Sequence, residues 1–273
     1  MNKYLLFSLL FSAAVLPVAV AGKTFDKASF WRSGRSKITE KGDGVLAVSL
    51  PATAYLKASE KIPVTAGKVY KLSGEFRFTG KGSTQPFWFG LSAYNADGRV
   101  IERVNVNRVS RMLPTVAVDA AKGSEAVELK GALNAWARRI PNQMAGRHRL
   151  AFGAAADGSD LPNFRLSGPI KVKGIVRLPN GNWQVGFTKP LEFDVKAGES
   201  VGFHHIGMTY MYVGKGKALN GEWTAFSCRY STAANAGVQG FYPTTAAVGI
   251  AMSCHQRGEG TIEFRNLSIN EEK

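Results

Sequence analysis

The stretch at residues 59–103 decides the fold: SEKIPVTAGKVYKLSGEFRF (59–78), a short gap containing Gly, Ser and Thr, and PFWFGLSAYNADGRVIER (86–103). From Tyr70 the apolar residues fall on every second position, and Phe87 starts another run with the same period. A two-residue period is typical of a strand with one buried face. The stretch therefore predicts a β-meander in which these consecutive strands pair.

The rest of the chain continues this pattern with short extended runs bounded by Gly, Pro or Asn. No stretch combines a helical period with capping residues, and Glu125 to Trp136 has an extended pattern. Many short strands at spacings near ten residues favour a sandwich. We predict an all-β fold: a jelly-roll-like β-sandwich of antiparallel strands, elaborated in the middle and C-terminal part, with residues 22–273 forming a single domain.

The N-terminus has the pattern of an export signal. Lys3 precedes an apolar run from Tyr4 to Val20, and the small residues Ala19 and Ala21 suit a signal peptidase. We expect residues 1–21 to be a signal peptide, which predicts a protein that is secreted or held in the periplasm or cell envelope. No later window is long and apolar enough to span a membrane. An uncleaved anchor is the competing interpretation.

The charge of the chain indicates an anionic partner. Its 35 Lys and Arg residues outnumber 20 Asp and Glu residues, for a net charge of +15. Such an excess attracts acidic polysaccharides, lipid headgroups or a negatively charged cell surface. Nucleic acid fits the charge but not the export signal, so a polysaccharide or cell-surface glycan is the predicted partner. The alternative is that scattered positive charge only keeps the protein soluble. The sequence leaves the oligomeric state open.

The chain has two cysteines, Cys228 and Cys254. Because export leads to an oxidising compartment, we expect one disulfide between them. It would close a loop of about 27 residues and contribute roughly 3 to 4 kcal/mol if unstrained. Metal binding, suggested by His255 directly after Cys254, is the alternative, but the spacing fits no chelating motif.

Three segments carry a resemblance to a known family: S-x-K-I-P-V-x-A-G-K-x-Y-x-L-S-G-E-F-R (59–77), F-G-L-x-A-Y-N-A-D-G-R-V-I (89–101) and G-T-I-E-F-R-N-L-S-I (260–269). They resemble galactose-binding-like jelly rolls, and in particular the carbohydrate-binding modules of bacterial cellulases. The resemblance implies a secreted β-sandwich, often stabilised by calcium, that holds glycans on a concave face or at loop tips. It carries no residue-level binding motif, and many proteins of this fold bind no sugar.

Sugar recognition needs exposed aromatic faces beside polar groups. Trp88 and Tyr94 alternate with the apolar residues of their run, so we expect them to point outward, with Arg77 beside them on the neighbouring strand. A basic loop further along the chain is a second candidate for anions. A layer that covers these aromatics is the competing interpretation. The candidate ligand-binding residues are Trp88, Tyr94, Arg77, Arg138, Arg139 and Arg147.

A catalytic role has weaker support. His204, His205, Tyr210 and Tyr212 could serve a polysaccharide lyase, in which His or Tyr removes a proton beside a neutralised uronate. Strand parity puts His204 with the two tyrosines and His205 on the other face, so no face gathers all four. We therefore assign no catalytic residues and interpret the chain as more consistent with a non-enzyme.

No cofactor is predicted with certainty. The sequence leaves a structural calcium ion open at Asp157 and Asp160, or near Asp26 and Glu40, although neither spacing matches a defined loop. The resulting hypothesis is a secreted, non-catalytic carbohydrate-binding protein for anionic polysaccharide. A lyase acting on a uronate-containing glycan and an extracellular structural or adhesive protein are the alternatives.

Overall fold

The computed structural model describes most of the chain after its N-terminal segment. The described residues are 23–32, 38–49, 54–84, 86–109, 112–143, 145–207, 211–213, 216–232, 238–254 and 260–272. The predicted signal peptide, residues 1–21, lies outside them, as do His255 and Tyr210. Within these ranges, no helix is long and apolar enough to cross a bilayer.

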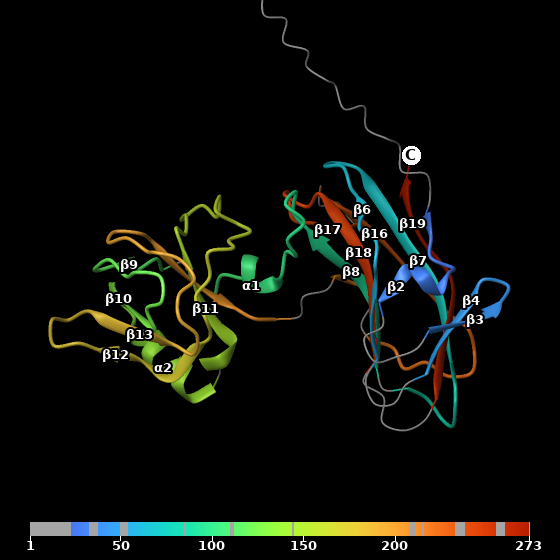
Figure 1. Ribbon diagram of the computed structural model, residues 1–273, viewed down its shortest axis with the longest axis horizontal. Helices are drawn as coiled ribbons and strands as arrows, with labels where there is room; N and C mark the ends of the chain where they lie inside the picture. Colours follow the sequence, from blue (N-terminus) through green and yellow to red (C-terminus); the bar gives the residue numbers. More distant parts are fainter. Residues whose placement is uncertain are drawn as a thin grey trace, which may run out of the picture.

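One lobe of the molecule is a sandwich of two sheets (Figure 1). The first, sheet A, is antiparallel except for the parallel pair at its β17 edge. In sheet order its strands are β17 (Val238–Gly240), β16 (Thr224–Ser231), β7 (Val69–Thr79), β19 (Thr261–Glu272), β4 (Val45–Ser49) and β3 (Ile38–Gly42), with β1 (Lys23–Thr24) on β19.

The opposing layer, sheet B, is built around a long central pair, and its pairings are all antiparallel. In sheet order its strands are β15 (Met211–Tyr212), β8 (Phe87–Tyr94), β18 (Ala247–Cys254), β5 (Ala54–Ala58) and β2 (Trp31–Arg32), with β6 (Ile62–Pro63) on β18. A short 3-10 turn, η1 (Ala28–Phe30), precedes β2. The predicted all-β sandwich is confirmed.

The alternation in β7 produces the core as expected. Tyr70, Leu72, Phe76 and Phe78 are each at most 1% exposed, while the residues between them face outward. Phe76 sits at the centre of an aromatic cluster, 4.7 Å from the ring centroids of both Phe87 and Phe89 across the sandwich. The remaining members of this cluster are Phe226 and Phe264.

The predicted pairing of β7 with β8 is wrong. β7 pairs with β16 and β19 in sheet A, and β8 pairs with β15 and β18 in sheet B. Both strands need a buried face, and a sandwich satisfies that need from opposite sheets as well as from one sheet. The segment between them therefore crosses from one layer to the other, as jelly-roll connections do.

A second lobe, which we call the inserted lobe, is made by the segment between β8 and β15 (Figure 1). It contains a four-stranded sheet, a two-stranded sheet and two α-helices. Its elements are α1 (Arg103–Val106), β9 (Thr115–Val116), β10 (Ala126–Lys130), α2 (Asn134–Gln143), η2 (Ala145–Arg147), β11 (His148–Phe152), β12 (Ile170–Arg177), β13 (Trp183–Phe187) and β14 (Val201–His205).

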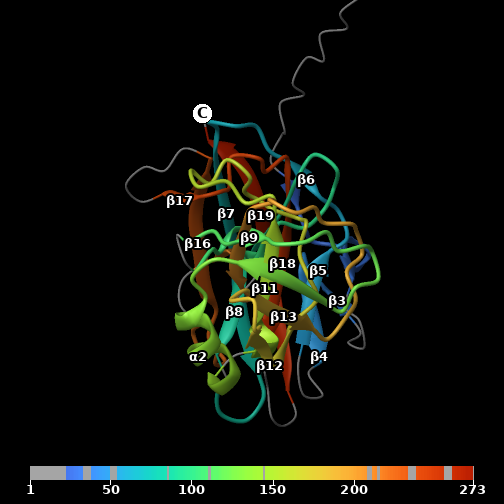
Figure 2. The same ribbon diagram turned by 90° about the vertical axis from the view of Figure 1, so that its left-hand side faces the viewer.

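The inserted lobe has a hydrophobic core of its own, separate from that of the sandwich. Its entry and exit lie side by side, because Val109 N donates to Phe203 O (2.9 Å) and His205 N donates to Asn107 O (3.1 Å). The central strands of sheet B, β8 and β18, lie on the side of the sandwich that faces the inserted lobe (Figure 1), and the lobe lies in front of the sandwich in Figure 2. One elaborated domain stays a prediction, since separate cores do not show whether the lobe folds alone.

Helix α2 was missed by sequence analysis, which expected extended structure as far as Trp136. The helix begins at Asn134, and Trp136 lies on the side that packs against the inserted lobe's core, stacked on Phe203 with centroids 4.3 Å apart. The helix is only ten residues long and contains Pro141, which is unfavourable inside a helix, so the sequence argued against a helix here.

The predicted disulfide between Cys228 and Cys254 is also wrong. Cys228 lies on β16 in sheet A, Cys254 lies on β18 in sheet B, and neither forms a disulfide. Both pack against the sandwich core from opposite layers. Facing sheets are typically about 10 Å apart, whereas the Cα atoms of a disulfide are usually about 4.4 to 6.8 Å apart.

Candidate functional site

The outer face of sheet B carries the two aromatic residues that the sequence singled out. Trp88 and Tyr94 are both half-buried and point away from the core, at opposite ends of β8. Between and beside them the outward positions hold very small residues, Gly90, Ser92, Gly249 and Ala251, and all four are buried, so the middle of this face is covered. We call this face, with Trp88 and Tyr94, the sheet B platform.

Small residues allow both rings to lie against the sheet. The indole of Trp88 covers Gly216, where a Cβ atom would come within 2.8 to 3.0 Å of three ring atoms. The ring of Tyr94 covers Gly249, where a Cβ atom would lie 3.2 Å from the ring. Side chains at either glycine would push the rings upright. The glycines therefore let the two partly exposed rings lie flat against the sheet at the two ends of β8.

Positive charges border the platform. Lys61 Nζ lies 4.3 Å from the ring centroid of Tyr94, a cation–π contact, and also donates to Gly98 O at 2.8 Å. Lys57 pairs with Ala251 on one side and with Arg32 on the other, which places both cations on the platform's face. The platform thus combines aromatic surface with a basic border.

Arg77 does not belong to this face. Its strand lies in sheet A, so Arg77 is on the opposite outer surface from Trp88 and Tyr94, and the expected grouping of the three is wrong. There the guanidinium groups of Arg77 and Arg265 lie 4.6 Å and 4.2 Å from the ring centroid of Trp223. Each arginine also binds a carboxylate, Arg77 to Glu263 and Arg265 to Glu75.

The hydrogen bond from Arg265 is the main cause of a lowered pKa at Glu75. The arginines of the sheet A surface are therefore already neutralised by protein carboxylates. An arginine and tryptophan ladder of this kind stiffens a sheet face and has little capacity left for an anion.

A basic cluster lies where the inserted lobe joins the sandwich. It contains Arg147, one of the candidate residues from the sequence, together with Arg103 from α1, His205 from β14 and Tyr242 from the segment between β17 and β18. We call these four residues the junction cluster. Burial lowers the pKa of His205, and the charges of Arg147 and Arg103 lower it further. Burial raises the pKa of Tyr242, which Arg103 partly offsets.

The other predicted basic residues lie on or beside α2. Arg138 is exposed on the helix, and its Nε donates to Asn134 O at 3.4 Å. The side chain of Arg139 lies outside the described residues. The structure therefore brings Arg147 to the junction cluster. It keeps Trp88 and Tyr94 on the platform and places Arg77 on the far sheet.

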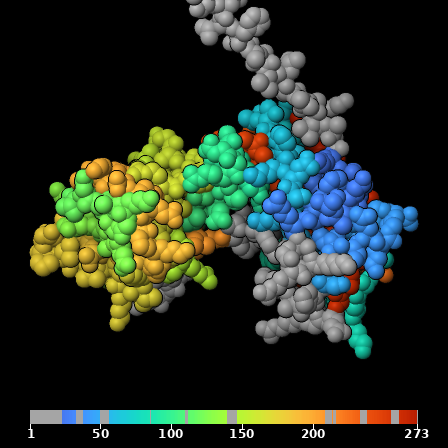
Figure 3. Space-filling view, in the orientation of Figure 1, coloured from blue at the N-terminus to red at the C-terminus, as the bar shows by residue number. Residues whose placement is uncertain are grey.

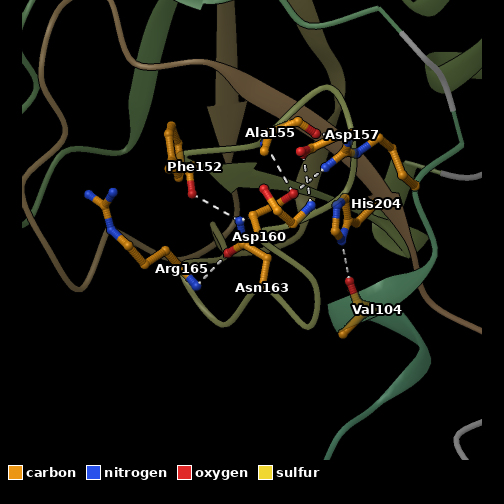
Figure 4. A network of polar contacts seen from close by, with 10 residues as sticks. Val104, Phe152, Ala155, Asp157, Asp160, Asn163, Arg165 and His204 are labelled. Atoms are coloured by element: carbon orange, nitrogen blue, oxygen red, sulfur yellow. Dashed lines mark hydrogen bonds and ion pairs between the residues drawn. The ribbon is translucent and has the colours of Figure 1, made fainter. Parts of the chain in front are cut away.

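The histidine pair is divided as strand parity predicted. His204 is fully buried, and its Nδ1 lies 2.6 Å from Val104 O (Figure 4). Burial lowers its pKa, which disfavours the charged form of the ring. His205 faces the junction cluster, while the side chain of Tyr212 lies outside the described residues. His204 is therefore unavailable for catalysis, with or without the tyrosines, because no substrate could reach its fully buried side chain.

A buried polar network fixes the base of the inserted lobe near His204. Arg108 binds Asp160 at 2.7 Å and Ala155 O at 2.6 Å, with both charged side chains almost fully buried. Asn163 donates to the other oxygen of Asp160 and to Phe152 O (Figure 4). Removing one partner of such a buried pair typically costs about 3 to 5 kcal/mol.

Three of the carboxylates considered for calcium, Asp157, Asp160 and Glu40, already accept hydrogen bonds from the protein. Burial raises the pKa of Asp160, but the hydrogen bonds from Asn163, Ala155 and Arg108 outweigh it and hold the pKa below its ordinary value. Asp160 therefore neutralises an arginine, and Asp157 bonds the backbone of Ser159. Glu40 accepts from Ala28 N at 2.8 Å. Across the described ranges, no three His, Cys, Asp or Glu side chains gather as metal ligands.

Comparisons with known proteins leave the chain without an assigned family. No family model matches it, and no curated protein does. Among solved structures, one described as "CBM4 structure and function" aligns over 89% of this chain and 78% of that chain, with 9% sequence identity and a TM-score of 0.31. A match at this TM-score establishes neither a common family nor a common ligand.

Proposed function

We propose that this chain is an exported, non-catalytic carbohydrate-binding protein whose sheet B platform takes an anionic polysaccharide. The observation that carries the proposal is the position of Trp88: it lies over Gly216 on the outer face of a rigid sheet and is half-buried there. The flat apolar side of a sugar ring packs against such an indole, while neighbouring polar groups take the hydroxyls.

The basic border supplies the preference for anions. Arg32, Lys57 and Lys61 lie on or beside the platform, and the chain as a whole carries a charge of +15. Opposite charge steers a polyanion to this face, and the effect weakens as salt screens it. Aromatic stacking is much less sensitive to salt, so the two contributions can be separated by measurement.

Affinity electrophoresis in gels containing polygalacturonate, alginate or a neutral glucan tests the proposal. We expect Trp88→Ala to weaken binding about tenfold, equivalent to about 1.4 kcal/mol. Trp223→Ala is the matched control, because it removes an indole from the opposite outer face. Equal losses in both variants, or no retention of the native protein on any polysaccharide at low and moderate salt, would refute the proposal.

A polysaccharide lyase is the second candidate, and one observation favours it: His205 lies beside Arg147 and Arg103. A lyase needs a base next to cations that neutralise a uronate. The two proposals give different outcomes with polygalacturonate. A lyase releases unsaturated products that absorb in the ultraviolet, and His205→Gln would abolish that release, whereas a binding protein retains the polymer unchanged.

A further inference from the structure

The arginines of this protein fall into two groups by their partners. Arg77, Arg108, Arg165, Arg229 and Arg265 each form an ion pair with a carboxylate. Arg103 and Arg147 belong to the second group, together with Arg32, Arg99, Arg138, Arg149 and Arg177, whose members form no ion pair with any residue that the structure describes. Arg103 and Arg147 also both lie near one histidine, His205: Arg103 packs against Gly207, and the carbonyl of Arg147 accepts from Ile206 N. The junction cluster is therefore an uncompensated concentration of positive charge.

The fold holds the cluster in place from several elements. The side chain of Arg103 packs against Gly207, leaving no room for a Cβ atom there. Arg147 is anchored through its backbone, whose carbonyl accepts from Ile206 N at 2.7 Å. His205 N donates to Asn107 O at 3.1 Å. α1, η2 and β14 thus bring three basic residues together, and the segment containing α1 lies between the lobes (Figures 1 and 3).

Among the described residues, the charges that act on His205 are both positive, and no acidic side chain offsets them. The groups that face it are Arg103, Arg147 and His148, whose ring centroid lies 5.0 Å from that of His205. The Nε2 atom of His205 is buried and has no hydrogen-bond partner among the described residues. Burial lowers the pKa of Arg149, and the negative charge of nearby Glu102 partly offsets this.

We propose that the junction cluster is a binding subsite for an oxyanion substituent, a carboxylate or a sulfate, of an acidic glycan. This inference rests on the proposed function, because it names the chemical class of glycan. The guanidinium groups of Arg103 and Arg147 match the planar oxygens of a carboxylate and can donate to them in pairs. Tyr242, 38% exposed beside Arg103, supplies a ring and a hydroxyl for the sugar that carries the anion.

A bound oxyanion would change His205. Its pKa lies below the ordinary value of 6.5 because of burial and two positive neighbours. A negative charge at the same place favours the protonated ring, so binding must be accompanied by a rise in the pKa of His205 and by proton uptake. This signature belongs to the junction cluster alone and does not depend on the sheet B platform.

The experiment compares trigalacturonate with its methyl ester, which differ only in carboxylate charge, by calorimetry on the full mature chain at low salt. We expect the acid to bind at least tenfold more tightly than the ester. Arg103→Gln and Arg147→Gln should each reduce this preference several-fold, and the double variant should abolish it. Arg177→Gln is the matched control, because it removes one exposed positive charge from β12, outside the junction cluster. It should leave the preference intact.

A second measurement follows the His205 ring by NMR during titration with trigalacturonate, with a sulfated trisaccharide as the other arm. A rise in its pKa with either ligand, absent in the double variant, supports the subsite and identifies the oxyanion it prefers. Equal binding of acid and ester overturns the inference and leaves only carbohydrate binding by the sheet B platform standing, without its preference for anions. Binding of neither by the full chain, with His205 shifted by inorganic sulfate, refutes the proposed function and keeps the anion subsite. Equally tight binding of double-stranded DNA, lost in the double variant, would overturn a glycan-specific role.

Discussion

His205 lies directly opposite His148 where β14 pairs with β11, and their ring centroids are 5.0 Å apart. Burial is the first cause of the low pKa of His205, and the same is true of His204 one residue earlier. Folding therefore disfavours the charged form of both His204 and His205.

This arrangement predicts acid sensitivity. A histidine whose pKa is lower in the folded state binds fewer protons there than in the unfolded chain. The contribution of these histidines to the free energy of unfolding is then fully present above the ordinary pKa of 6.5, and it decreases as the pH drops below that value. We expect urea midpoints to decrease from pH 7 to pH 5. His205→Gln should flatten this dependence, and a midpoint that rises on acidification would contradict the prediction.

Gly216 tests the position of Trp88 without touching the indole. A Cβ atom at Gly216 would collide with the ring at 2.8 Å, so Gly216→Ala should tilt the ring off the sheet. We expect a shift in tryptophan fluorescence and a loss of polysaccharide affinity approaching that of Trp88→Ala. Gly221→Ala is the control, since nothing lies within 4 Å of a Cβ atom there. Unchanged affinity in Gly216→Ala would show that the position of Trp88 does not matter for polysaccharide binding.

Gly74 and Leu267 form a packed pair across sheet A. β19 bulges between Arg265 and Ser268, and the side chain of Leu267 fills the space that a Cβ atom at Gly74 would need, at 3.0 Å. Gly74→Ala should lower the free energy of unfolding by about 1 to 3 kcal/mol through overpacking. The loss should shrink in a Leu267→Ala background, although Leu267→Ala itself costs about 2 to 5 kcal/mol.

Denaturant unfolding of the four species in this cycle measures the coupling. Gly240→Ala, on the edge strand β17, is the control because its added methyl group meets nothing within 4 Å. Additive losses at Gly74 and Leu267 would contradict the contact.

The cysteines should titrate as two thiols. Burial raises the pKa of Cys254 to about 11 and also raises that of Cys228, so both react slowly as thiols at pH 8. Half-buried Cys228 should be modified first and fully buried Cys254 only after unfolding. Thiol counting with and without denaturant, on protein never exposed to reductant, measures this. If the denatured, unreduced protein shows no thiols, the two cysteines are joined by a disulfide after all, and the prediction is contradicted.

The local pattern of residues sufficed for much of the site. Alternation along β8 correctly placed Trp88 and Tyr94 outside the core, and parity along β14 correctly separated His204 from His205. Both inferences depend only on the two-residue period of a strand. The error about Arg77 arose at the next level, because the same alternation fits a strand in either layer of a sandwich.

By itself, the sequence determined that this chain is built from strands with one buried face, and which side chains of each strand point outward. That information is local, since it depends on the geometry of a few consecutive residues. Only the tertiary structure decided that β7 and β8 lie in opposite sheets, that Cys228 and Cys254 do not bond, and that Arg103 joins Arg147 beside His205. These are contacts between distant segments, which depend on how the layers pack, and alternation along one strand is the same whichever partner it finds.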